Sequence, residues 1–134
     1  TALLARELRD GLVPRLGVEM VERAAGLLDE PGISVANDAK ILRRVAGVRA
    51  LHDPTEGGLA TGVREMLAAA GCGGVIERGA VPVLPETAAV AEALGLDPLG
   101  MLASGALALA ADPAAADDLR TTADRYGIPL ARIG

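Results

Sequence analysis

The sequence of 134 residues contains no Phe and no Trp, and Tyr126 is its one aromatic residue. The core must therefore be built from aliphatic side chains, and no aromatic platform exists on which nucleic-acid bases could stack. The formal net charge of -5 also lacks the basic excess that binding to a phosphate backbone requires. These absences argue against a nucleic-acid-binding protein.

Cysteine and histidine each occur once. With Cys72 alone, an internal disulfide and a cysteine-rich zinc site are excluded, and we interpret Cys72 as a small structural thiol. His52 has no second histidine with which it could share a metal ion. No apolar run reaches the ~20 residues of a membrane-spanning helix, and no signal-peptide pattern opens the chain, so we expect a cytoplasmic protein.

Hydrophobic periodicity predicts a series of helices, with short apolar runs between them that are typical of strands. The expected helices cover residues 15–30, 35–47, 59–70, a short stretch ending at Gly95, and 113–126; the expected strands cover 48–51, 73–79, 106–111 and 128–134. Ser34 and Asp112 are suitable N-caps, and glycines at 71, 95 and 127 are suitable helix ends.

From residue 47 onward this order of elements is the split βαβ plan of a ferredoxin-like sheet. We therefore predict one α/β (α+β) domain over 1–134, in which 1–46 form leading helices and 47–134 form a split βαβ core with helices packed on the sheet. Because Thr1 is not a start methionine and the chain stops within an expected strand, we also expect a fragment that is truncated at both ends.

The stretch "LHDPTEGGLA", residues 51–60, lies where an expected strand leads into an expected helix. Thr55 is positioned to cap that helix, and Gly57 and Gly58 lack side chains, so a phosphate could approach the free amides of the first turn. Asp53 could contribute a carboxylate to a Mg²⁺ ion beside such a phosphate. A capped turn without any ligand is the alternative interpretation of the same residues.

Two further features extend this hypothesis. His52 is either a hydrogen-bonded structural residue or a polar contact to a ligand. A second loop, Ser104–Gly105 in "ASGALALA", allows a tight turn before an expected strand, and it could approach the same ligand if the two strands are neighbours. Neither loop has the spacing of a P-loop or of a dinucleotide-binding motif.

The segments "HDPTEGGLATGVREM", "VPVLPET", "ALGLDPLGMLASGALALA" and "ARIG" occur here in an order that resembles the C-terminal domain of the AIR synthase-related superfamily. Aminoimidazole ribonucleotide synthetase, selenophosphate synthetase, thiamine-monophosphate kinase and the hydrogenase maturation factor HypE belong to that group. The likeness is strongest to HypE-like and other AIR synthase-related proteins. It is weak over residues 1–33 and good from Ser34 onward.

The resemblance implies a PurM C-terminal-domain-like fold and a parent enzyme that uses ATP and Mg²⁺ to phosphorylate an amide or acyl oxygen. An N-terminal domain, with no equivalent in this chain, would bind most of the nucleotide and form a homodimer. The present chain would close the cleft, would be inactive alone, and would bind no cofactor tightly by itself. A non-catalytic ligand-binding or regulatory module that keeps the fold is the alternative.

By the same resemblance, Thr55, Gly57 and Gly58 match the threonine–glycine loop of the family. Asp53 matches an aspartate that helps to hold metal in selenophosphate synthetase-like members. Glu56 departs from the pattern, because relatives have Gly or Arg at that position. The catalytic residues and the phosphoryl acceptor are not identified by any motif, and Cys72 does not match the modified cysteine at the end of HypE.

Overall fold

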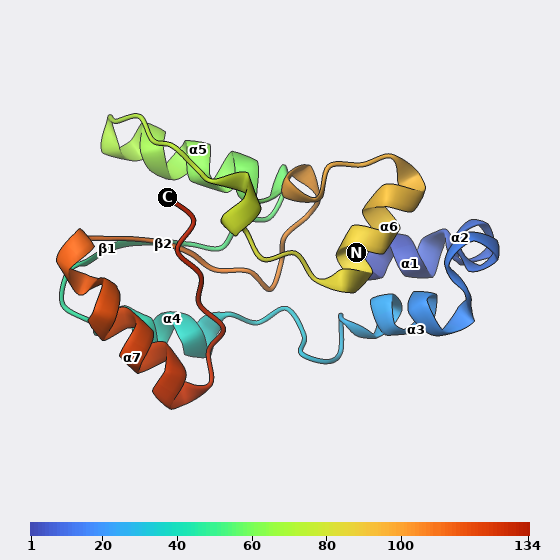
Figure 1. The fold of residues 1–134 in the computed structure, drawn as a ribbon, viewed down its shortest axis with the longest axis horizontal. Helices are drawn as coiled ribbons and strands as arrows, with labels where there is room; N and C mark the ends of the chain where they lie inside the picture. Colours follow the sequence, from blue (N-terminus) through green and yellow to red (C-terminus); the bar gives the residue numbers. More distant parts are fainter.

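The computed structural model describes residues 1–134 and contains seven α-helices, two β-strands and three short 3₁₀ helices (Figure 1). In chain order these are α1 (Ala2–Glu7), α2 (Arg9–Leu16), α3 (Val18–Gly26), α4 (Ala36–Leu42), β1 (Val48–His52), α5 (Gly58–Ala70), η1 (Arg78–Ala80), α6 (Pro85–Leu94), η2 (Pro98–Gly100), β2 (Ala108–Ala111), η3 (Pro113–Ala115) and α7 (Ala116–Tyr126).

The first three helices pack with α6 into one lobe, seen on the right of Figure 1. Its core consists of Ala5, Leu12, Val21, Ala24, Val90 and Ala93. Alanine at three of these positions lets the helices approach closely. The helix expected over 15–30 is interrupted at Gly17, which adopts φ +82° between α2 and α3. The short helix α6 contributes Val90 and Ala93 to this core, so it packs on the leading helices rather than on the sheet.

The second lobe is built on an antiparallel pair of strands. β1 pairs with β2 so that His52 lies opposite Ala108 and Leu51 lies opposite Leu109. Helices α4 and α7 cover this pair through a core of Leu42, Ala115, Leu119 and Ala123. Helix α5 lies on the other side of the strands, at the top of Figure 1.

The α/β class is confirmed, but the sheet has two strands where four were expected. The segments 73–79 and 128–134 meet only around residues 75–77 and 133–134 and form no ladder: the Glu77 amide donates to the Ile133 carbonyl (2.7 Å). Gly73, Gly74 and Pro129 explain this difference, because glycine weakens a strand and proline cannot donate a ladder hydrogen bond. Val75 within this segment is 82% exposed.

The helix ends follow the sequence more closely than the helix starts. Gly71, Gly95 and Gly127 terminate α5, α6 and α7 in the left-handed conformation, as predicted. The prediction for Ser34 was wrong, since α4 begins after Val35 without a side-chain cap. Asp112 likewise makes no capping hydrogen bond. Its carboxylate binds Arg49 instead.

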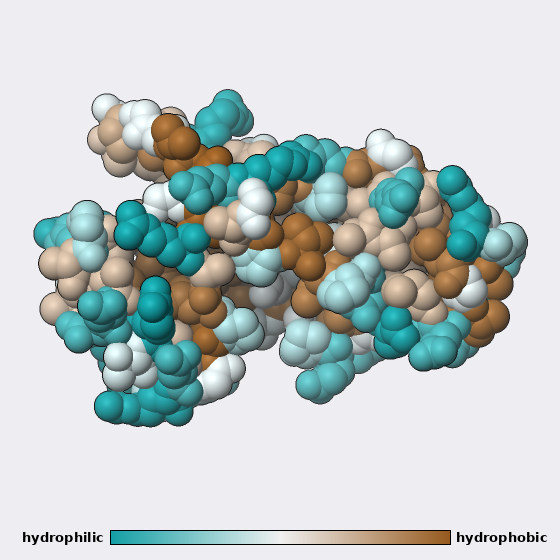
Figure 2. Space-filling model, viewed as in Figure 1, coloured by the Kyte–Doolittle hydropathy of each residue, from teal (hydrophilic) through white to brown (hydrophobic).

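The molecule exposes a large surface for its size. Its accessible surface is 8423 Å², whereas a compact monomer of 13.5 kDa exposes about 6,500 Å². Figure 2 shows apolar side chains, in brown, on the surface of both lobes among hydrophilic ones. No helix combines the length and the apolar character that crossing a membrane would need.

Candidate functional site

The candidate loop occupies the junction that the sequence indicated. β1 ends at His52 and α5 begins at Gly58, so residues 53–57 connect the strand to the helix. Pro54 is buried in this loop, while Asp53, Thr55 and Glu56 are exposed. The loop therefore presents its polar side chains to solvent and anchors itself through its proline.

Thr55 does not cap α5, in contrast to the prediction. The N-cap of α5 is Gly57, in the left-handed conformation, and no side chain caps the helix. The Thr55 hydroxyl donates instead to the Glu56 carboxylate (3.1 Å), and the Thr55 carbonyl accepts from the Gly58 amide (3.0 Å). Without a side-chain cap, the amides of Leu59 and Ala60 donate to no backbone carbonyl. These amides are the groups that an anion could bind at this helix end.

The two loop glycines are required by the protein itself. Both have positive φ, +76° at Gly57 and +63° at Gly58. A Cβ atom on Gly57 would collide with the Thr61 side chain, and one on Gly58 would collide with the carbonyl oxygens of Leu99 and Met101. The backbone around η2 thus fills the space beside Gly58. The fold itself therefore requires glycine at this position, whether or not a ligand binds.

His52 is held by α5. Its Nε2 lies 2.9 Å from Oε2 of Glu65, and the His52 side chain is 33% exposed. Gly62, one turn into α5, makes this approach possible, because a Cβ there would lie 2.7 Å from Cβ of Pro54 and 3.2 Å from Cδ2 of His52. Sequence reasoning missed Glu65 and Gly62. The spacing from Gly58 to Gly62, one helical turn on one face, was the available signal.

The second loop reaches the same end of the strand pair. Because β1 and β2 are antiparallel neighbours with His52 opposite Ala108, the turn before β2 lies at the end where β1 leaves the sheet. Ser104 is exposed, and Gly105 has φ +98°, where a Cβ atom would lie 3.1 Å from the carbonyl oxygen of Gly32. The two loops are brought to one end of the sheet, and no hydrogen bond joins them.

Metal ligands do not gather in this chain. No group of three or more His, Cys, Asp or Glu side chains is placed to hold a metal ion. Asp53 is exposed and would contribute one carboxylate. A Mg²⁺ ion bound there would need its remaining ligands from phosphate oxygens, from water or from another part of a larger protein.

Two arginine–aspartate pairs join separate elements of the fold, one at η2 and one at the opposite end of the strand pair from the loop. Arg78 in η1 donates to Asp97 through Nη1 and Nη2 (3.0 and 2.7 Å), and Arg49 in β1 donates to Asp112 through Nε and Nη2 (2.9 and 2.6 Å). The hydrogen bond from Arg78 lowers the pKa of Asp97, with help from the Leu99 amide, and the hydrogen bond from Arg49 lowers the pKa of Asp112. Sequence reasoning missed both pairs, whose members are 19 and 63 residues apart.

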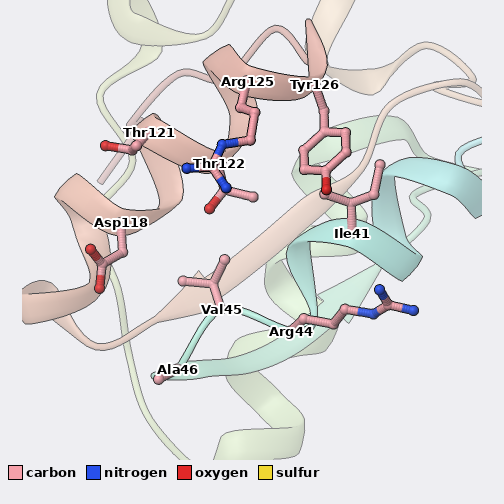
Figure 3. A pocket seen from close by; sticks show the side chains of 9 residues that line it. All are labelled: Ile41, Arg44, Val45, Ala46, Asp118, Thr121, Thr122, Arg125 and Tyr126. Atoms are coloured by element: carbon pink, nitrogen blue, oxygen red, sulfur yellow. The ribbon is translucent and has the colours of Figure 1, made fainter.

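A groove beside α7 lies away from the loop. It has a volume of about 390 Å³ and opens between α4 and α7, on the other side of the strand pair from α5 (Figure 3). Tyr126 points from α7 towards Ile41 on α4, whereas Asp118 and Arg44 point outward in different directions. The side chains do not converge on a point, and none of the predicted site residues lines this groove.

Comparison with known proteins identifies relatives over most of the chain. Residues 16–134 match the family described as AIR synthase related protein, C-terminal domain. The chain is 46% identical over 94 residues to the carbamoyl dehydratase HypE of Cupriavidus necator, covering 70% of this chain and 26% of that protein. It is 42% identical over 78 residues to the carbamoyl dehydratase HypE of Escherichia coli, covering 58% of this chain and 23% of that protein.

A solved structure shows the same fold. The crystal structure of E. coli HypE, a hydrogenase maturation protein, superposes with a TM-score of 0.67 at 34% sequence identity, over 83% of this chain and 37% of that one. The chain thus spans about a quarter of the length of the curated relatives that it matches.

Proposed function

The chain belongs to the AIR synthase-related family as its C-terminal domain, and from this premise we propose that it forms one wall of the ATP site in a HypE-like enzyme. The observation that carries the proposal is the likeness to HypE in both sequence and structure, 46% identity to one relative and a TM-score of 0.67 to another. The likeness is to a hydrogenase maturation protein, and we place this chain in the same process and in the cytoplasm.

The proposed reaction is phosphoryl transfer from ATP to an amide or acyl oxygen. The relatives are carbamoyl dehydratases by name, and a dehydratase removes the elements of water, one oxygen and two hydrogens, from its substrate. Phosphorylation of a carbamoyl oxygen turns it into a good leaving group, which makes such a dehydration possible. Catalysis of phosphoryl transfer depends mainly on positioning and on neutralising charge.

In this proposal the loop 52–58 contributes the phosphate-facing wall. The free amides of Leu59 and Ala60 supply donors at the positive end of α5. The hydroxyl of Thr55 and the imidazole of His52 lie at the same junction, and Ser104 and Gly105 approach from the second loop. Bound Mg²⁺ would supply charge neutralisation, and Asp53 is the carboxylate of this chain that would hold it.

Glu56 limits how a phosphate can bind. Its exposed carboxylate accepts from the Thr55 hydroxyl and would repel an anion placed directly at this position. We therefore propose that a phosphate would bind at the amides beyond Gly58, away from this carboxylate.

The partner in this proposal is an N-terminal AIR synthase-like domain of the same protein, which binds most of the nucleotide and forms the homodimer. Two observations support a larger assembly: the surface exceeds that of a compact monomer of this mass by about 1,900 Å², and no metal-binding cluster lies within the chain. The isolated chain is accordingly proposed to be inactive.

A chimera tests this function. Residues 34–134 replace the matched segment of E. coli HypE, and calorimetry measures binding of ATP with Mg²⁺. Asp53→Ala should weaken binding at least about tenfold if the carboxylate holds the metal. Asp117→Ala, which removes an exposed carboxylate of α7, is the matched control and should have no effect. Equal affinities in both variants would contradict the role of the loop and favour a module without catalysis.

A further inference from the structure

The segment that follows α5 turns back towards the start of that helix. After Gly71 the chain runs back along α5 to η1, as Figure 1 shows. Leu67 packs on the backbone of Gly74 along this return path. Arg78, the first residue of η1, is thereby delivered to Asp97, which precedes η2.

Asp97 fixes the shape of η2. Its Oδ1 accepts from the Leu99 amide (3.0 Å) while both carboxylate oxygens accept from Arg78. A carboxylate that accepts from a backbone amide two residues on defines the local turn, and a bidentate arginine adds a fixed orientation. The same turn exposes the Leu99 carbonyl towards Gly58.

Helix η2 in turn determines the surroundings of Gly58. The carbonyl oxygens of Leu99 and Met101 approach Gly58 so closely that no Cβ atom fits between them. Gly58 is buried, and so is Met101. Since Gly58 is the first residue of α5, a displacement of η2 changes the packing of the helix end that carries the free amides.

We propose that Arg78 and Asp97 are positioning residues that hold η2 against Gly58 and so fix the conformation of the loop 53–57. Neither residue touches the candidate ligand position in this arrangement; they act through the backbone of residues 99–101. The consequence for ligand binding rests on the proposed function, whereas the positioning itself does not.

Amide hydrogen exchange on this chain, followed by NMR, tests the positioning without any ligand. The variant Arg78→Gln removes the bidentate pair and leaves the Asp97–Leu99 hydrogen bond intact. Exchange of the Gly58 amide, which is bonded to the Thr55 carbonyl, should become about two- to fivefold faster, as expected for losing one exposed ion pair. Exchange of the α7 core amides at Leu119 and Ala123 should not change.

Asp112→Asn is the control, because it disrupts the other exposed bidentate arginine–aspartate pair, which lies at β1 rather than at η2. It should leave the Gly58 amide unaffected. The conservative variant Arg78→Lys, which keeps a cation beside Asp97 and leaves the Asp97–Leu99 hydrogen bond in place, should retain part of the protection that Arg78→Gln loses. An unchanged Gly58 amide in Arg78→Gln, or an equal change in Asp112→Asn, would overturn the proposal.

Titration of the same variants with ATP and Mg²⁺ separates this inference from the proposed function. If Gly58 exchanges faster in Arg78→Gln and the HypE chimera binds ATP with Mg²⁺ equally well with and without Asp53→Ala, the positioning holds and the proposed function fails. If the nucleotide binds the unaltered chain and Arg78→Gln equally well with unchanged Gly58 exchange, the function holds and the positioning role fails.

Discussion

At the scale of single residues, Gly58 is a glycine of the candidate loop that the fold itself requires. Its φ of +63° alone disfavours other residues, and the carbonyls of Leu99 and Met101 leave no room for a Cβ. We predict that Gly58→Ala lowers the free energy of unfolding by about 2–4 kcal/mol, from left-handed strain and overpacking together. Urea denaturation measures this change.

Gly71→Ala is the control for that prediction. Gly71 has φ +65°, and nothing lies within 4 Å of the position of its Cβ. This variant should show the left-handed strain alone, about 1 kcal/mol. Equal losses for Gly58→Ala and Gly71→Ala would mean that the contact with η2 does not restrict position 58.

At Thr55 we predict that a substitution has almost no effect on stability. Its hydroxyl bonds only to the exposed Glu56 carboxylate, and Gly57 is the N-cap of α5. Thr55→Ala should therefore change the free energy of unfolding by less than about 0.5 kcal/mol. A loss near 1 kcal/mol, the usual effect of removing an N-cap side chain, would show that Thr55 caps the helix in solution.

At the scale of elements, α5 is seated on the end of β1 through a glycine. Gly62→Ala would place a Cβ 2.7 Å from that of the buried Pro54, so we expect a loss of about 1–2 kcal/mol despite the better helix propensity of alanine. In α2, by contrast, nothing lies within 4 Å of the position that a Cβ atom on Gly11 would take. Gly11→Ala should instead stabilise the protein by about 0.5–1 kcal/mol. Thermal and urea denaturation of both variants compare the two helices, and stabilisation by both changes would contradict the seating of α5.

The arginine–aspartate pairs that join elements predict a dependence on pH. Arg78 and Arg49 hold the pKa values of Asp97 and Asp112 below the ordinary value of 3.8. A lowered pKa in the folded state stabilises the protein above the unfolded pKa, and this contribution is lost as the pH falls through the folded pKa. The double variant Asp97→Asn/Asp112→Asn should be less stable than the unaltered chain near neutral pH, and the difference should shrink below about pH 3.8.

Urea denaturation across this range measures the difference. A gap between the two proteins that stays constant down to the lowest pH would contradict the role of the carboxylates.

The elements differ in how well the sequence predicts them, for physical reasons. Helix ends at Gly71, Gly95 and Gly127 are local events, and local residues determine them. The strands at 48–52 and 108–111 were found because short apolar runs mark them in the sequence. Residues 73–79 and 128–134 were expected to be strands, but a ladder needs a partner with matching register, and Gly73, Gly74 and Pro129 weaken it. The predictions that Ser34 and Thr55 cap helices were wrong, because α4 and α5 start after Val35 and Gly57 without a side-chain cap.

The sequence likewise predicts only part of the candidate site. Its position between β1 and α5 follows from the sequence, because a strand pattern and a helix pattern meet at residues 52–58. The residues that support the site could not be predicted from the sequence, because Glu65, Arg78 and Asp97 reach it only through the tertiary fold. The antiparallel pairing of His52 with Ala108 is likewise a long-range event, and it alone brings Ser104 to the same end of the sheet.

At the scale of the whole molecule, two small cores are joined by extended segments. Six buried residues form one core and four form the other, and 17 of 134 residues are buried in all. The surface beyond that of a compact monomer, about 1,900 Å², is comparable to what one partner loses in a large permanent interface. In the proposed assembly, this surface would bind the N-terminal domain.

The central claim is that the loop 52–58 forms part of a nucleotide site, and amide chemical shifts of this chain titrated with ATP and Mg²⁺ test it most directly. The account predicts weak binding, with the shifts concentrated at residues 52–60 and 103–106 and abolished in Asp53→Ala. Shifts concentrated in the groove between α4 and α7, or no shifts at millimolar nucleotide, would contradict it.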